Sequence, residues 1–147
     1  MKILTKILSA FFILFAFSCD EKECCNEADS ESTSIYGSWI LFERGYSPGS
    51  GYIVDPVPPS PAQTINIKRD GIMSSNIKEL NEFRFYYVED DVTPESKVIS
   101  FFKTDPGPSP DPSTFIVSYT LTREGSKMIL GYRYCFEGCH LGFRKAN

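Results

Sequence analysis

From Tyr36 onward the chain repeats short runs in which apolar and polar residues alternate, and this pattern restricts the folds open to it. Alternation at every second residue is typical of an antiparallel strand with one buried face. Clusters of Gly, Pro, Asn and Asp separate the runs, and no long stretch has the period of a helix. The pattern predicts eight strands, at residues 36–46, 63–69, 72–77, 82–89, 97–103, 113–123, 127–134 and 140–145.

Several of the predicted connections are tight turns. Asp70–Gly71 and Glu124–Gly125 fit hairpin turns in which a glycine adopts a positive φ. A meander of eight strands can close into a barrel or form a sandwich, and closure removes the exposed strand edges. We therefore expect an all-β domain over residues 36–147, folded as an eight-stranded antiparallel up-and-down barrel.

The first 18 residues have a different character. Lys2 and Lys6 precede an almost purely apolar run from Ile7 to Phe17. As a helix this run reaches about 16 Å, which is too short for about 30 Å of bilayer hydrocarbon but suits a secretory signal peptide. We predict a cleaved signal peptide over residues 1–18, with a buried N-terminal helix as the alternative.

Residues 16–19, AFSC, resemble the lipobox of bacterial lipoproteins, in which the cysteine after the cleavage point is acylated. The acidic stretch CDEKE that starts at Cys19 is similar to the surface-display signal of lipoproteins from the Bacteroidota. The resemblance implies lipidation at Cys19 and an anchor in the outer membrane facing the cell surface. A periplasm-facing anchor and secretion without lipid are the alternatives. Residues 19–35 are mostly acidic and polar, so we expect a disordered tether there.

The domain itself also resembles a known family. Gly37-Ser38-Trp39 forms the G-x-W motif that opens the first strand of lipocalins. With the SPG segment at 47–49, the Asp70–Gly71 turn and CFEGC at 135–139, the chain is similar to small lipocalin-like lipoproteins of the Bacteroidota. The resemblance implies that Trp39 plugs one end of the barrel and that Arg144 packs over it. It implies no specific activity.

The odd-numbered connections of an eight-stranded meander share one end of the barrel. The Pro-rich loops at 47–62 and 104–112 and the cysteine loop are therefore expected to crowd one mouth, away from Trp39. A tyrosine joins an apolar ring to a hydroxyl, which suits a small amphipathic ligand or a sugar ring. A barrel filled by its own side chains is the alternative. The candidate ligand-lining residues are Phe85, Tyr87, Tyr119 and Tyr132.

Three charged residues lie among apolar neighbours in the predicted strands. Glu43, with Arg44 and Arg84, is a candidate for a charge pair inside the barrel that would hold the polar part of a ligand. An outward-facing cross-strand pair explains the same residues equally well.

Four cysteines remain besides Cys19. Cys135 and Cys139 flank a Gly-containing turn between two strands, a spacing that permits a disulfide in an oxidising compartment. A zinc site formed by these two residues, His140 and a tether cysteine is the alternative, although the C-x3-C spacing is poor for structural zinc. Cys24 and Cys25 are open to pairing with each other, to pairing between molecules, or to remaining free.

We predict neither enzymatic activity nor a cofactor or metal. His140 is the only histidine, and a disulfide at Cys139 removes the thiol that a Cys–His pair requires, so a hydrolase is the lesser alternative. A net charge of −4 without a basic cluster argues against a nucleic-acid partner. Two functions remain. One is an envelope lipoprotein whose barrel binds a small apolar or amphipathic ligand. The other is an interaction module that docks an envelope protein or glycan through the Pro-rich loops, around a filled barrel.

Overall fold

The computed structural model describes residues 34–91, 96–111, 117–136 and 138–146. These residues form nine strands and no helix, so no helix among them could cross a membrane. The strands are β1 (Gly37–Tyr46), β2 (Ile53–Pro56), β3 (Thr64–Ile67), β4 (Met73–Ser75), β5 (Phe85–Asp90), β6 (Lys97–Phe102), β7 (Val117–Glu124), β8 (Lys127–Tyr132) and β9 (His140–Lys145).

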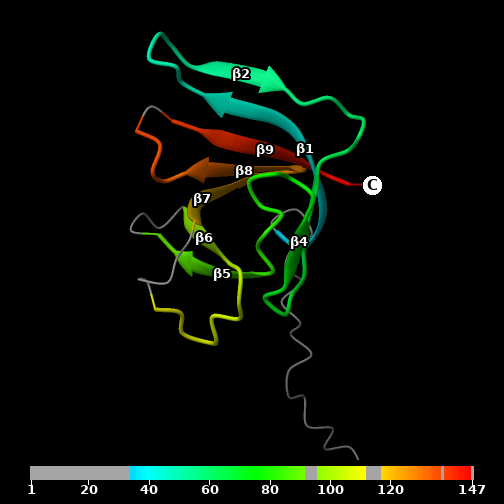
Figure 1. Ribbon diagram of the computed structural model, residues 1–147, viewed down its shortest axis with the longest axis vertical. Helices are drawn as coiled ribbons and strands as arrows, with labels where there is room; N and C mark the ends of the chain where they lie inside the picture. The colour runs from blue at the N-terminus through cyan, green and yellow to red at the C-terminus, as the bar shows by residue number, and fades with distance from the viewer. Residues whose placement is uncertain (1–33, 92–95, 112–116, 137, 147) are drawn as a thin grey trace, which may run out of the picture. The chain divides into compact units, whose positions relative to one another are not determined.

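Eight of the strands form a nearly closed antiparallel barrel in the order β4-β3-β1-β9-β8-β7-β6-β5 (Figure 1). The first and last strands pair directly, with Trp39 of β1 opposite Lys145 of β9. The ring closes between β4 and β5 through a bridge from Ile72 to Phe85 and a 2.8 Å bond from the Met73 N–H to the Arg84 carbonyl. The predicted all-β, eight-stranded up-and-down barrel is thus confirmed.

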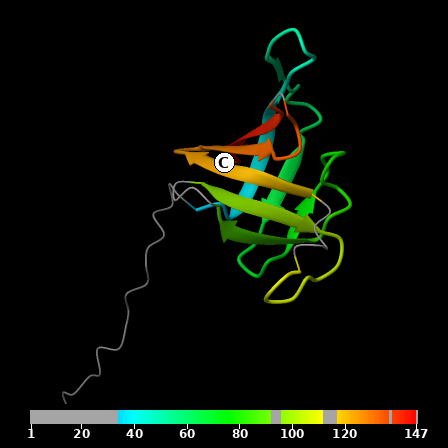
Figure 2. The same cartoon turned by 90° about the vertical axis from the view of Figure 1, so that its left-hand side faces the viewer.

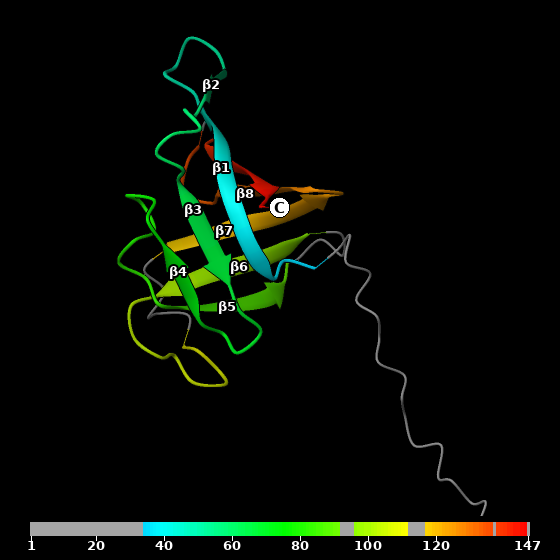
Figure 3. The ribbon, with the colours of Figure 1, turned by 90° about the vertical axis from the view of Figure 1, so that its right-hand side faces the viewer.

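β2 is an additional strand that the alternation did not predict. It pairs with the second half of β1, where Arg44 lies opposite Asp55, whereas the first half of β1 pairs with β3. All four residues of β2 are exposed, so it has no apolar face that a sequence pattern could reveal. Figures 1, 2 and 3 all show the β1–β2 hairpin projecting beyond the barrel.

The inward-facing side chains of the barrel form one apolar core. Figure 3 shows β1, β3 and β4 crossing in front of β5, β6 and β7, and the core lies between these two sides. Removing large side chains such as these from water is the main driving force for folding. The largest fully buried side chains are Trp39, Phe101, Phe143, Leu41, Ile65, Ile67, Met73, Ile77, Leu80, Ile99, Met128 and Leu130.

Trp39 lies at the end of the barrel where β1 begins, as the resemblance implied, but its basic neighbours differ from the expectation. The Arg123 guanidinium lies 4.5 Å from the centroid of the indole and the Lys145 ammonium lies 4.8 Å from it. Arg144 is exposed, because successive residues of a strand face opposite sides and Phe143 and Lys145 face inward. Arg123 and Lys145 therefore take the place predicted for Arg144.

The inward face of β5 is also shifted from the expectation. Phe83 is buried, but it lies before the strand begins, and within β5 the residues that face the core are Tyr86 and the half-buried Val88. Because side chains alternate along a strand, Phe85 and Tyr87 are on the outer side of the barrel. A shift of one residue at Arg84 thus exchanges the two faces of this strand.

Only one of the two Pro-rich loops lies beside the cysteine loop, so the expectation that both share one mouth is not met. The first does meet the cysteine loop, since the Tyr52 hydroxyl bonds His140 Nδ1. The second lies with residues 105–108 against residues 70–72 and 85–87, along the seam between β4 and β5. In Figures 1, 2 and 3 the two loops lie at opposite ends of the domain.

The predicted disulfide between Cys135 and Cys139 is present, with 5.7 Å between the two Cα atoms. Ile35, assigned above to the tether, packs against the core. The predicted signal peptide at 1–18, Cys19, Cys24 and Cys25 lie outside the described residues.

Candidate functional site

A β-bulge in β1 decides which charged residue faces the barrel. Leu41 lies opposite Phe143 and Glu43 lies opposite Gly142, so Phe42 is the extra residue between them. Without the bulge, strict alternation after Leu41 would turn Glu43 inward. With it, Arg44 lies opposite the inward-facing Leu141 and points into the mouth of the barrel.

The mouth holds a pocket of about 430 Å³. Its walls come from the end of β1, the loop between β4 and β5, the start of β7, the end of β8 and the start of β9. This volume falls in the range of about 300–1,000 Å³ that is usual for small-molecule sites. The lining residues are Arg44, Gly45, Tyr46, Glu79, Val117, Tyr119, Tyr132, Cys139, His140 and Leu141.

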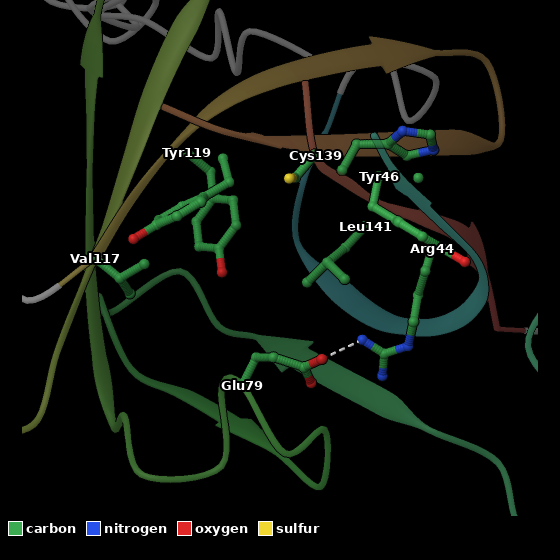
Figure 4. A pocket seen from close by; sticks show the side chains of 10 residues that line it. Arg44, Tyr46, Glu79, Val117, Tyr119, Cys139 and Leu141 are labelled. Atoms are coloured by element: carbon green, nitrogen blue, oxygen red, sulfur yellow. Dashed lines mark hydrogen bonds and ion pairs between the residues drawn. The ribbon is translucent and has the colours of Figure 1, made fainter. Parts of the chain in front are cut away.

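An ion pair spans one side of this pocket. Arg44 Nη1 donates to the carboxylate of Glu79, and Arg44 Nη2 donates to Gln63 Oε1 at 2.7 Å. Figure 4 shows Arg44 and Glu79 reaching toward each other, with Tyr119 across the pocket. The loop that carries Glu79 is anchored by the fully buried side chains of Ile77 and Leu80. The guanidinium is thus held at the pocket wall by two acceptors.

Tyr119 contributes an aromatic ring and a hydroxyl to the wall of the pocket. The residue is only 5% exposed, but its hydroxyl, which makes no hydrogen bond to the residues that the structure describes, is not among the fully buried polar atoms and so opens into the pocket. The ring packs edge-on against Phe101 and lies tilted beside Tyr132, at centroid distances of 5.8 and 5.5 Å. Burial raises the pKa of Tyr119 to about 12, with smaller upward contributions from Glu79 and Tyr132 and a downward one from Arg44.

We expect the domain to lose stability between about pH 10 and about pH 12 through two buried tyrosines. Burial raises the pKa of Tyr86, as of Tyr119, from 10.0 to about 12, so the unfolded chain loses these protons first. The free energy of unfolding should therefore fall with rising pH, by at most about 1.4 kcal/mol per pH unit for each tyrosine. Denaturant unfolding across this range should show a shallower fall in Tyr119→Phe and in Tyr86→Phe. Tyr134→Phe, at a residue 65% exposed, should leave the slope unchanged. An unchanged slope in the Tyr119→Phe and Tyr86→Phe variants would contradict this expectation.

A second polar cluster lies on the outer face of β1 and β9. His140 Nε2 lies 3.3 Å from Glu43 Oε1, and its Nδ1 bonds the hydroxyl of Tyr52, whose ring stacks on the imidazole. Since a carboxylate only accepts, Nε2 carries the hydrogen, and a neutral ring then accepts at Nδ1. This cluster ties the β1–β2 hairpin to the last strand.

The structure brings together some of the predicted residues and separates others. Tyr119 and Tyr132 both line the mouth pocket, whereas Phe85 and Tyr87 border a separate outer hollow with Asp70 and Asp105. Glu43 faces outward, so it is Arg44 that supplies the inward charge. Arg84 is exposed and donates to the carbonyls of Asn81 and Phe83.

Glu79 was not predicted as a site residue. It lies in a polar stretch with no apolar period, and its approach to Arg44 depends on a loop that joins two short strands. The neighbouring Ile77 and Leu80 were the available signal, because two apolar residues in a polar connection indicate an anchored loop.

No cluster of three or more His, Cys, Asp and Glu side chains able to hold a metal occurs in the part of the chain that the structure describes. The thiols proposed as alternative zinc ligands, Cys135 and Cys139, are joined in the disulfide. Comparisons of the chain with protein-family models, with curated proteins and with solved structures find no match. The function is therefore inferred from the residues of this chain.

Proposed function

We propose that this protein is a cell-envelope lipoprotein whose barrel binds a small amphipathic ligand in the mouth pocket. The observation that supports the proposal best is the pocket itself, about 430 Å³ in volume. It joins apolar walls from Val117 and Leu141 to a few convergent polar groups, which is the usual composition of a ligand site. The core fills the barrel beneath it.

The envelope location is supported by the N-terminal sequence. The apolar leader, AFSC at 16–19 and the acidic CDEKE fit a lipid anchor on Cys19 in the outer membrane, facing the cell surface. Two acyl chains hold a protein at a membrane stably. With the domain tethered in this way, the pocket would collect a ligand from the surrounding medium, or from the periplasm if the anchor faces inward.

Binding is favoured over catalysis by the chemistry at the mouth. Cys139 borders the pocket but is held in the disulfide, so it offers no thiolate nucleophile. His140 is engaged on the outer face by Glu43 and Tyr52. The groups that line the pocket can donate and accept hydrogen bonds, and we propose no reaction for them.

Native mass spectrometry of the full chain, extracted from its cells in mild detergent, tests this function. We expect a small adduct that leaves on denaturation, and a denatured mass that lacks residues 1–18 and carries acyl chains on Cys19. Val117→Trp should abolish the adduct, because the indole fills the pocket. Val54→Trp, the same change on exposed β2, should keep it. An adduct that survives Val117→Trp would show that the ligand lies elsewhere.

Exposed apolar side chains on the β1–β2 hairpin favour a second candidate function, docking to another envelope protein or a glycan. Ile53 and Val54 are exposed on β2, whose only partner among the described residues is β1, and Tyr52, just before the strand, is exposed as well. Edge strands of this kind can pair with another chain. A full-length protein without any adduct would favour this function over ligand binding.

A further inference from the structure

We infer that the ligand of the mouth pocket is an uncharged ring compound with neighbouring hydroxyl groups, that is, a saccharide unit. The inference rests on the proposed function and specifies its ligand class. The juxtaposition of three features supports it: a neutralised Arg44–Glu79 pair, the hydroxyl of Tyr119, and the rings of Tyr119 and Tyr132.

The charge balance of the pocket favours a neutral ligand. Arg44 and Glu79 are an ion pair, and Gln63 holds the second amino group of the guanidinium. An anionic group placed beside Arg44 would have to displace Glu79 or lie against its carboxylate. A cationic group beside Glu79 would have to displace Arg44 or lie against its guanidinium. A ligand without charge can contact both side chains and leave the pair intact.

The same pair matches two adjacent hydroxyl groups. A guanidinium only donates hydrogen bonds and a carboxylate only accepts them, whereas each hydroxyl can do both. Of two neighbouring hydroxyls, one can therefore accept from Arg44 while the other donates to Glu79. Hydrogen bonds to charged groups are stronger than those between neutral ones, so this arrangement selects for vicinal diols. Figure 4 shows the two side chains converging at one side of the pocket.

Tyr119 supplies a third polar contact for a ligand, because its hydroxyl lies at the wall of the pocket. Only 5% of the residue is exposed, and its hydroxyl makes no hydrogen bond within the described part of the chain, but the oxygen is not among the fully buried polar atoms and therefore opens into the pocket. A phenol hydroxyl can both donate and accept a hydrogen bond. Burial raises its pKa to about 12, so it is protonated at neutral pH. A ligand hydroxyl at this point would satisfy it.

The tyrosine rings and the depth of the pocket fit the apolar face of a sugar. Tyr119 and Tyr132 lie with ring centroids 5.5 Å apart and planes 48° apart, forming an angled wall beside Leu141. The C–H face of a pyranose packs well on such rings. A long alkyl chain does not suit the site, because Phe101 and Phe143 are fully buried in the barrel that it would have to enter.

Saturation-transfer NMR on the full chain tests the inference with named probes. The sugars are D-glucose, D-galactose, D-mannose and N-acetyl-D-glucosamine, and the contrasting probes are dodecanoate and 1-naphthol. We expect transfer to the ring C–H protons of at least one sugar. Comparing D-glucose with maltotriose shows whether the natural ligand is a free sugar or the end of a glycan chain. A site for the end of a glycan chain binds maltotriose at least as tightly as D-glucose.

Two conservative variants, each with a matched control, connect binding to the named groups. Tyr119→Phe and Glu79→Gln should each weaken the sugar by about three- to tenfold, the usual effect of one hydrogen bond. Tyr134→Phe and Glu82→Gln make the same changes at exposed residues that do not line the pocket. The phenylalanine keeps the ring that packs against Tyr132, so both controls should leave the affinity unchanged.

The outcomes separate this inference from the function on which it rests. Sugar binding that both pocket variants weaken supports the inference. Binding of dodecanoate or 1-naphthol without any sugar overturns it and leaves the ligand-binding function standing. Sugar binding that neither variant changes overturns it too, because the sugar then lies outside the pocket. If no probe binds and native mass spectrometry finds no adduct, the inference and the proposed function fail together.

Discussion

Replacing Trp39 with alanine should lower the free energy of unfolding by about 3–5 kcal/mol, the usual cost of deleting a buried tryptophan side chain. The indole is completely buried, and its Nε1 donates to the Ile35 carbonyl at 2.7 Å. It also supports two cations, since Arg123 and Lys145 both lie within 5 Å of its centroid. Its loss therefore leaves a cavity and removes the ring that both cations contact.

Arg123 makes this substitution more costly than the cavity alone. Its Nε atom is buried without a hydrogen-bond partner in the described structure, and burial lowers the pKa of its guanidinium. Contact with the indole face offsets part of that desolvation. Without Trp39, Arg123 would have to move toward solvent or remain buried with less compensation.

Denaturant unfolding followed by far-UV circular dichroism would measure the loss, because the fluorescence of the only tryptophan is removed with it. Trp39→Phe should give an intermediate value, since it keeps an aromatic face but loses the N–H donor. Tyr134→Ala, at an exposed aromatic residue, should change stability by less than about 0.5 kcal/mol. If Trp39→Ala were as mild as Tyr134→Ala, the indole would not be the structural plug of this end.

The strands of the barrel could be predicted from the sequence because each has one buried face. In β7 and β8, the apolar residues Leu121, Met128 and Leu130 alternate with more exposed residues; β8 lies within its predicted range, and β7 ends one residue beyond the predicted 123. β2 could not be predicted in this way. It is exposed on both faces and exists because its backbone pairs with β1, which is a long-range contact that leaves no local pattern.

The candidate site was predictable only in part, and the failures have a common cause. Tyr119 and Tyr132 were identified because β7 and β8 keep strict alternation up to the mouth. Phe85 and Tyr87 were misplaced because the chain shifts by one residue before β5 begins. The bulge at Phe42 has the same effect in β1, where it turns Arg44 rather than Glu43 inward. A single-residue shift exchanges two faces without altering the composition of the strand.

Gly45→Ala is expected to destabilise the domain by about 1–3 kcal/mol, as overpacking usually does. A Cβ atom at this position would overlap both His140 Nδ1 and the hydroxyl of Tyr52. Gly45 is therefore required for the imidazole and the phenol to lie across β1, where they connect the hairpin to β9. The alanine should also break the Tyr52–His140 bond, which NMR of the imidazole would detect.

Two comparisons show whether the overlap is the cause. Gly131 is the other neighbour of His140 in the sheet, on β8, but a Cβ there meets its nearest atoms only at 3.9 Å. Gly131→Ala should therefore be nearly neutral, although it makes the same change on the other side of β9. In a Tyr52→Ala/His140→Ala background, Gly45→Ala should also lose most of its effect, because the atoms that it would displace are gone. A cost that persists in that background would mean that β1 needs the glycine for its own backbone. In that case the contact between Tyr52 and His140 would not be the reason for a glycine at position 45.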